Sequence, residues 1–363
     1  MIKISDIYKL ENSREYVNEV ITSGWLSFSG IYVKKCEKML EELLGIKHVL
    51  LTNSGSAATH CLIKSIKFEY PDCKKIYVQN NCYIAAYNSV LTEFKNTEIE
   101  ILPINENTWN LDLKYLNKIE KNSALLIVHN LGNILPINKI KNLRPDIIIV
   151  EDNCEGFMGS YNKKYSGTEA LASSVSFFAN KHITSGEGGA FMTNNTKLYK
   201  KIISFTRQGI SEYKYIHIMH AYNYKMSNIN AAILYSQLEQ LDIILKKKTI
   251  LFNRYYELLE NEKNIELQKI EENTCHSKWI FGIKILKNLE YKDIELFFNN
   301  NNIEIRPFFY DIYKHKYLNN IKKTVSKSLN HTIILLPLHA NLNISDIDYI
   351  SNIIKKFISK EIN

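Results

Sequence analysis

Two neighbouring stretches decide the fold of this chain, IIIVEDNCEGFMGS at residues 147–160 and SFFANKHITSGEGGA at residues 176–190. The apolar run at 147–150 predicts a buried strand, and Glu151 and Asp152 stand at its carboxyl end. A buried carboxylate is costly unless a cation or hydrogen-bond donors meet it. Asp152 is therefore a candidate ligand for a cationic group, although a helix N-cap or an internal ion pair would also explain a single Asp.

Lys181 lies in the second stretch, among small, polar and glycine residues. An amine that forms an imine must sit on a rigid turn inside a pocket, and this segment fits that description. A free lysine amine has a pKa of about 10.4 and is a poor nucleophile until it is desolvated or condensed with an aldehyde. Most lysines are surface charges, so Lys181 alone predicts little. The glycines of SGEGG at 185–189 do not have the spacing of a dinucleotide fingerprint.

A third motif is TNSGSAATH at residues 52–60, where Gly55 and Ser56 precede a helical pattern. Exposed backbone N–H groups at a helix N-terminus, with hydroxyls beside them, form a ready phosphate site. A Ser-Gly-Ser turn also serves simply as an N-cap, so this motif is informative only together with the others.

Outward from these motifs, short apolar runs alternate with helical patterns. The predicted strands are 48–52, 75–78, 99–103, 124–128 and 146–150, and the predicted helices are 35–44, 55–67 and 228–260. This alternation predicts an α/β fold with a mainly parallel mixed sheet flanked by helices, and such folds place their ligands at the strand ends.

The pattern changes after about residue 240. A long helix is followed by an isolated strand at 280–286, another near 333–336 and a C-terminal helix from 345. We therefore expect a large domain at residues 1–240 and a smaller α+β domain at residues 241–363.

The net charge of +8 does not indicate nucleic acid, because the basic residues are spread along the chain. An excess of positive charge suits a substrate that bears phosphates. Lys246, Lys247 and Lys248 form a tight triplet, which we interpret as a solvated helix face. His217 and His220 lack a nearby Cys or acidic ligand, so no metal site is expected.

The six cysteines include no CxxC pair, so neither a disulfide framework nor a zinc ribbon is indicated. No stretch approaches about 18 uncharged apolar residues, and Lys3 and Asp6 interrupt what would have to be a signal core. We expect a cytoplasmic protein that binds neither membrane nor nucleic acid.

In chain order, the phosphate turn, the strand-end Asp and the glycine-flanked Lys resemble the DegT/DnrJ/EryC1/StrS family of sugar aminotransferases, which have the aspartate-aminotransferase fold type. The likeness covers most of the chain. Its further motifs are SGWLSFSGIYVKKCEKML at 23–40, VHNLGN at 128–133, EDNCEGFMGS at 151–160 and YNYKMSNINAAI at 222–233.

The resemblance implies pyridoxal 5'-phosphate as the cofactor. Lys181 would hold it as an imine, and Asp152 would bind its protonated pyridine nitrogen. The cofactor phosphate would be held by Gly55, Ser56 and Ser176.

Further positions carry family roles. Tyr83 would stack on the cofactor ring, although it could equally be a core tyrosine. Glu155 stands where many members have Gln or His near the cofactor hydroxyl, and the Glu form looks like the perosamine-synthase branch. Asn223 matches a residue that reaches the phosphate of the neighbouring subunit's cofactor, which implies a homodimer with shared active sites.

Four residues are candidates for the sugar or nucleotide side: Trp25, Ser27, His182 and Arg306. Trp25 and His182 could equally be packing residues. Three positions depart from the family pattern, with Lys225 in place of Arg, Asn133 in place of Gln and Gln79 in place of Pro. These departures concern local contacts more than the chemistry.

The implied reaction moves an amino group from L-glutamate to C4 of a UDP-, dTDP- or GDP-linked 4-keto-6-deoxyhexose, giving a 4-amino-4,6-dideoxy sugar such as viosamine or perosamine. Amination of a 3-keto sugar and dehydration at C3 are alternatives. The related sugar 3-dehydratases have His in place of the lysine, so Lys181 favours transamination. A regulator that binds the cofactor without turnover is a further alternative, against which Lys181 and Asp152 argue.

Overall fold

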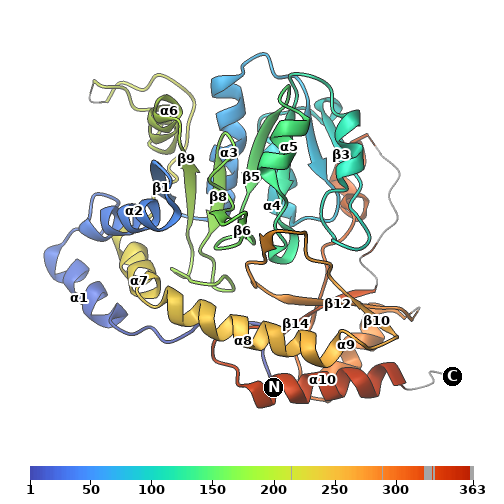
Figure 1. The fold of residues 1–363 in the computed structure, drawn as a ribbon. Coiled ribbons are helices and arrows are strands. Elements are labelled where there is room, and N and C mark those ends of the chain that lie inside the picture. The colour runs from blue at the N-terminus through green and yellow to red at the C-terminus, as the bar shows by residue number, and fades with distance from the viewer. Residues whose placement is uncertain (214, 288, 323–328, 330–331, 360–363) are drawn as a thin grey trace.

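A computed structural model describes the chain apart from residues 214, 288, 323–328, 330–331 and 360–363 (Figure 1). Its largest sheet has seven strands, and all except β9 run parallel to one another. In sheet order these are β1 (His48–Thr52), β9 (Gly189–Thr193), β8 (Ser173–Ser176), β5 (Ile148–Asp152), β4 (Ala124–Val128), β2 (Ile76–Gln79) and β3 (Ile99–Leu102). The predicted mainly parallel mixed sheet is confirmed.

Helices cover both faces of this sheet. Successive residues of a strand point to opposite faces, and in this sheet the side chains on both faces are apolar and buried. Leu126 and Val150 belong to a core with helices on one face, whereas Leu125 and Ile149 pack with helix α5 on the other. The helices of this part are α1 (Ser13–Ser23), α2 (Ile31–Leu44), α3 (Gly55–Glu69), α4 (Ile84–Leu91), α5 (Ile137–Leu143), α6 (Thr196–Thr206) and α7 (Asn228–Leu238). The short 3₁₀ turns here are η1 (Asn96–Glu98), η2 (Leu113–Lys118) and η3 (Asn130–Gly132).

A second sheet lies below the first in Figure 1, beside the last three helices. Its strand order is β10 (Ile265–Leu267), β12 (Phe281–Ile285), β14 (Ile333–Leu336) and β13 (Arg306–Pro307), all antiparallel. The helices beside it are α8 (Leu241–Leu259), α9 (Tyr291–Asn300) and α10 (Ile344–Ser359), with the 3₁₀ turns η4 (Ile312–Lys314) and η5 (Lys316–Leu318) nearby in the sequence. A small third sheet contains β11 (Thr274–Cys275), β6 (Ser160–Tyr161) and β7 (Lys164–Tyr165).

Three expectations about this second part need correction. The strand expected to be isolated at 280–286 is β12, which pairs with β10 and β14. The single helix expected at 228–260 is broken at Gln240, where φ is −102° and ψ is 1°. Lys248 is not on a solvated face but is 4% exposed, because α8 buries Ile244, Leu251 and Tyr255 on the same side.

The N-terminus joins the second sheet region. Ile2 bridges to Ile303, and the Ile4 N–H donates to the Glu304 carboxylate at 3.0 Å. The domain division at residue 240 stays a prediction. It assigns residues 2–4 to the large domain, whereas in the structure these residues contact Ile303 and Glu304 of the second part. None of the helices in the described residues combines the length and the apolar character needed to span a bilayer.

Candidate active site

Asp152 is the last residue of β5, and its neighbour β8 ends at Ser176. Because the two strands are parallel, their carboxyl ends meet at one edge of the sheet. The Asp152 carboxylate is 6% exposed, and Oδ1 accepts hydrogen bonds from the Cys154 N–H at 3.1 Å and the Ser174 hydroxyl at 3.5 Å. Within the described residues, both hydrogen bonds reach the same oxygen, so Oδ2 is available to a ligand.

Lys181 follows β8 on a turn at the same edge. Its Nζ lies 4.1 Å from the centre of the Trp279 ring, and the indole N–H of Trp279 donates to the Asn180 carbonyl at 2.9 Å. No local sequence pattern pointed to Trp279, which lies almost a hundred residues further along the chain.

Glu155 brings a second carboxyl group to this edge. Its Oε2 accepts the Leu131 N–H at 2.8 Å. Burial raises the pKa of Glu155 to about 7, although the Lys181 charge and the Leu131 N–H oppose the shift. Leu131 adopts the left-handed conformation, with φ of 60°, which is strained for a branched residue and aims its N–H at this carboxylate.

The phosphate turn meets the end of β8. Ser54 caps α3, since its hydroxyl accepts the Ala57 N–H at 3.1 Å. A methyl group at Gly55 would lie 2.7 Å from Cβ of Ser176, so only glycine lets the helix start this close to the strand. Ser56 is exposed in the first turn, and the positive end of the helix dipole points to the same place.

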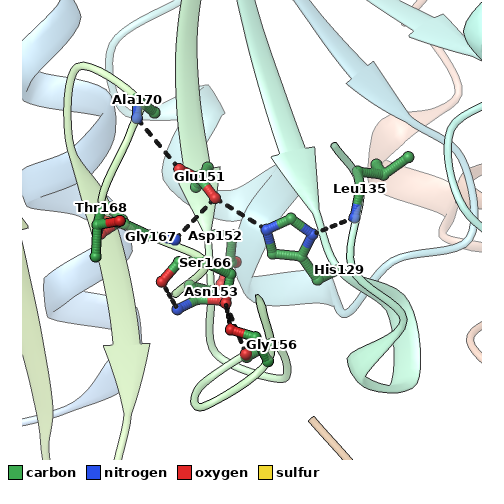
Figure 2. Close-up of polar contacts among 12 residues, drawn as sticks. His129, Leu135, Glu151, Asp152, Asn153, Gly156, Ser166, Gly167, Thr168 and Ala170 are labelled. Carbon is green, nitrogen blue, oxygen red and sulfur yellow. Dashed lines mark hydrogen bonds and ion pairs between the residues drawn. The ribbon is translucent and has the colours of Figure 1, made fainter. Parts of the chain in front are cut away.

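Behind Asp152, the side chain of Glu151 points to the other face and fixes the strand end (Figure 2). Its carboxylate accepts hydrogen bonds from His129 Nε2 at 3.0 Å, the Gly167 N–H at 2.9 Å and the Ala170 N–H at 3.3 Å. Three donors from two segments thus hold β5 in register.

The chain is similar to a known family of proteins. Residues 8–355 match the family described as the DegT/DnrJ/EryC1/StrS aminotransferase family. The chain belongs to this family. The match confirms the family resemblance and the aminotransferase class expected from the sequence.

One curated relative and two solved structures are similar to this DegT/DnrJ/EryC1/StrS aminotransferase over nearly its whole length. A GDP-perosamine synthase of Vibrio cholerae is 32% identical over 363 residues, and 96% of each chain is covered. A Helicobacter pylori aminotransferase involved in pseudoaminic acid biosynthesis has a TM-score of 0.90 at 22% identity, covering 98% of each chain. An E. coli GDP-4-keto-6-deoxy-D-mannose-3-dehydratase with bound hydrated PLP has a TM-score of 0.90 at 21% identity, covering 97% of this chain and 99% of its own. At these identities the two structures show the fold alone.

The site of this family member fits pyridoxal phosphate on its own geometry. The close approach of Gly55 to Ser176 leaves a helix N-terminus and two hydroxyls for a phosphate. Asp152 offers a buried carboxylate oxygen for a pyridinium N–H, and Lys181 lies on the next strand connection.

The two other predicted cofactor residues of this aminotransferase are exposed. Tyr83 stands at the N-cap position of α4 without a side-chain capping hydrogen bond, is 58% exposed and meets the Phe309 ring edge-on at 6.0 Å. Asn223 is exposed, and its carbonyl accepts the Asn53 side-chain amide at 3.3 Å, next to the phosphate turn.

Three of the four substrate candidates lie apart from Lys181 and Asp152. Trp25 and Ser27 are exposed in the segment between α1 and α2, and the Trp25 carbonyl accepts the Asn228 side chain at 2.9 Å. Arg306 lies on β13 and pairs with Glu304 at 3.4 Å. Within the described residues, none of these three contacts Lys181 or Asp152.

His182, the fourth candidate, is buried. Neither ring nitrogen has a hydrogen-bond partner among the described residues, and burial lowers the pKa of His182 well below its ordinary value. It lines a small cavity with Lys181, Lys248 and His339.

Proposed function

We propose that this aminotransferase moves an amino group from L-glutamate to C4 of a nucleotide-linked 4-keto-6-deoxyhexose, giving a 4-amino-4,6-dideoxy sugar. The observation that carries the proposal is the convergence of Asp152, Lys181 and the Gly55 turn at one edge of the sheet. The sugar class is supported by the name of the Vibrio cholerae relative. The expected location, the cytoplasm, stays a prediction.

The cofactor is pyridoxal phosphate, which when bound supplies an electron sink for the bond that breaks at the donor carbon. Asp152 holds a proton on the pyridine nitrogen through its carboxylate. Nζ of Lys181 takes the proton from Cα of the amino donor and, in the second half-reaction, delivers a proton to the sugar carbon. Such general acid–base transfer is worth about 10² to 10⁴ in rate. Gly55, Ser56 and Ser176 bind the phosphate.

Glu155 and Tyr83 complete the cofactor contacts. The Glu155 carboxyl lies near enough to Lys181 and Asp152 to sense both charges, which suits a partner for the cofactor hydroxyl. Tyr83, with its ring against Phe309, supplies an aromatic face at the rim. Trp25, Ser27, His182 and Arg306 remain candidates for the sugar-nucleotide side, and His182 shares a small cavity with Lys181.

The first test is the absorbance spectrum of the protein with added pyridoxal phosphate, before and after L-glutamate, for wild type and Lys181→Ala. A band of lysine-bound cofactor that requires Lys181 and bleaches with glutamate is expected. A wild type without this band, or a band unchanged in Lys181→Ala, overturns the assignment. Without bleaching, the regulator alternative would stand.

The position of amination needs a second experiment. Product analysis with a 4-keto and a 3-keto nucleotide sugar separates the proposed reaction from 3-amination and from dehydration at C3. We expect a 4-amino product and no loss of the C3 oxygen. A 3-amino or 3-deoxy product would replace the proposal by the corresponding alternative.

We further propose a homodimer in which Asn223 of one subunit reaches the phosphate of the other. The exposed position of Asn223 beside the phosphate turn supports this. Mixing Lys181→Ala with Asn223→Ala gives heterodimers that each hold one intact site if sites are shared. About a quarter of the wild-type activity is then expected from random pairing, whereas sites within single subunits would give no recovery.

A further inference from the structure

Trp279 contacts the base of the site through three different groups. Its ring face lies 4.1 Å from Nζ of Lys181, and its indole N–H donates to the carbonyl of Asn180, the residue before the lysine. Its own carbonyl accepts a hydrogen bond from Nζ of Lys248 at 2.9 Å. One residue therefore connects the turn that carries Lys181 to helix α8.

The indole is held rigidly. Trp279 is buried in a hydrophobic cluster with Trp109, Leu131 and Phe308. Lys248, which anchors its backbone, is buried on the inner face of α8. Packing and the hydrogen bonds of its indole N–H and its backbone carbonyl thus fix the orientation of the ring relative to Nζ.

Lys181 needs such a support in the proposed reaction. Once the amino donor replaces it on the cofactor, its amine is free on a flexible four-carbon stem, yet it must stay close to Cα of the donor. Glu155 lies close enough to sense the lysine charge and would compete for the amine. The indole face next to Nζ counters this pull, since an amine over an indole is attracted as an ammonium ion and packs well as a neutral group.

We propose that Trp279 is a positioning residue whose indole face holds the Lys181 amine beside the reacting carbon whenever the donor, and not the lysine, is joined to the cofactor. This inference rests on the proposed function. The ring touches the lysine and not the reacting carbon, so it acts through Lys181.

The test compares Trp279→Met, which fills space without a ring, with Trp279→Phe, which keeps a ring face but lacks the N–H. The control is Phe281→Leu, a buried aromatic two residues away that stacks on Tyr255 at 4.6 Å and is not in contact with Lys181 among the described residues. Three quantities are measured: the pH profile of the rate at which lysine-bound cofactor forms, the affinity for pyridoxamine phosphate, and kcat and KM for glutamate.

In Trp279→Met, the limiting rate on the alkaline side of the profile is expected to fall on the order of tenfold, because the amine loses its fixed position. At this limit the rate no longer changes with pH, so the fall reports the position of the amine. Pyridoxamine phosphate makes no bond to the lysine, so its affinity is expected to stay within about twofold of wild type, and kcat to fall with little change in KM. Trp279→Phe retains most of the rate, and Phe281→Leu loses stability but not rate.

An unchanged limiting rate in Trp279→Met overturns the inference. So does an equal fall in pyridoxamine phosphate affinity, which would mean that the indole only shapes the cofactor cavity. If Trp279→Met does not fold, a Trp279→Phe rate as low as a tenth of wild type in folded protein would also reject it. A wild type that binds no cofactor at Lys181 overturns the proposed function and this inference together, whereas the outcomes above overturn this inference alone.

Discussion

Nε2 of His129 lies 3.0 Å from Oε2 of Glu151, and neither side chain is exposed. Nδ1 of the same ring accepts the Leu135 N–H at 3.1 Å (Figure 2), so the ring proton sits on Nε2 and is donated to the carboxylate. A neutral imidazole thus supports a buried charge one residue before Asp152.

Replacing Glu151 by Gln is expected to destabilise the protein. The carboxylate accepts from three donors, whereas an amide must turn its NH₂ toward at least one of the backbone N–H groups of Gly167 and Ala170. The free energy of unfolding is expected to fall by about 2 kcal/mol, measured by urea denaturation. Glu120→Gln, in an exposed pair with Lys75, is the control and is expected to change stability by less than about 0.5 kcal/mol. Equal effects of the two changes would contradict this prediction.

Glu155 makes stability fall as the pH rises. Burial raises the pKa of this carboxyl from 4.5 to about 7. Between those values the folded chain keeps a proton that the unfolded chain releases, so this residue lowers the free energy of unfolding by up to about 3 kcal/mol across that window. Denaturation at about pH 5 and about pH 8, without added cofactor, is expected to show this loss in wild type and much less of it in Glu155→Gln. Identical pH dependence in the two proteins would refute the prediction.

Lys248 is expected to make stability rise as the pH rises, which is the opposite of the effect of Glu155. Burial, and then the charge of Lys181, lowers the pKa of Lys248 from 10.5 to about 7. Between these values the unfolded chain binds a proton that the folded chain lacks, so stability rises with pH there, by several kcal/mol at most. Relative to Lys248→Met, wild type is expected to gain stability from about pH 7 to about pH 10. The control is Lys246→Met, on the exposed side of the same helix. Its free energy of unfolding is expected to change with pH as in wild type, and a loss of this pH dependence would contradict the role of Lys248.

Gly55→Ala tests the close approach at the phosphate turn. Alanine favours helices over glycine by about 1 kcal/mol, but the new methyl would lie 2.7 Å from Cβ of Ser176. We expect a net loss of about 1 to 3 kcal/mol of stability and weaker cofactor binding. The double variant Gly55→Ala/Ser176→Gly is expected to recover part of the stability, measured as a double-mutant cycle. A Gly55→Ala protein as stable as wild type would contradict this prediction, because it would show that the turn accommodates a methyl group at residue 55.

Local pattern was enough to predict strand β5 and the place of Asp152 at its carboxyl end, but it did not predict the neighbouring strand β8. The parallel pairing of these two strands places Asp152 beside Ser174 and brings both carboxyl ends to one edge of the sheet. The family resemblance then implied roles that the geometry accommodates.

The rest depended on contacts that no local pattern encodes. Trp279 reaches Lys181 only because the second sheet packs against the first part of the chain. His182 follows Lys181 directly, yet its ring lies inside the protein. Lys248 is different, because its spacing from Ile244, Leu251 and Tyr255 is a helical signal that the run of three lysines concealed.

The bridge between Ile2 and Ile303 bears on how the chain is made. The carbonyl of Ile2 accepts the Glu304 N–H at 2.9 Å, and the Ile2 N–H donates to the Asn302 carbonyl at 2.6 Å, so Ile2 pairs with a segment that is synthesised some three hundred residues later. The large sheet, complete by residue 193, has all its strands long before that partner exists. The residues of the large sheet can thus fold during synthesis, whereas the segment around Ile2 stays unpaired until residues 302–304 have been made. The second sheet region therefore closes last, from segments that are about three hundred residues apart in the chain.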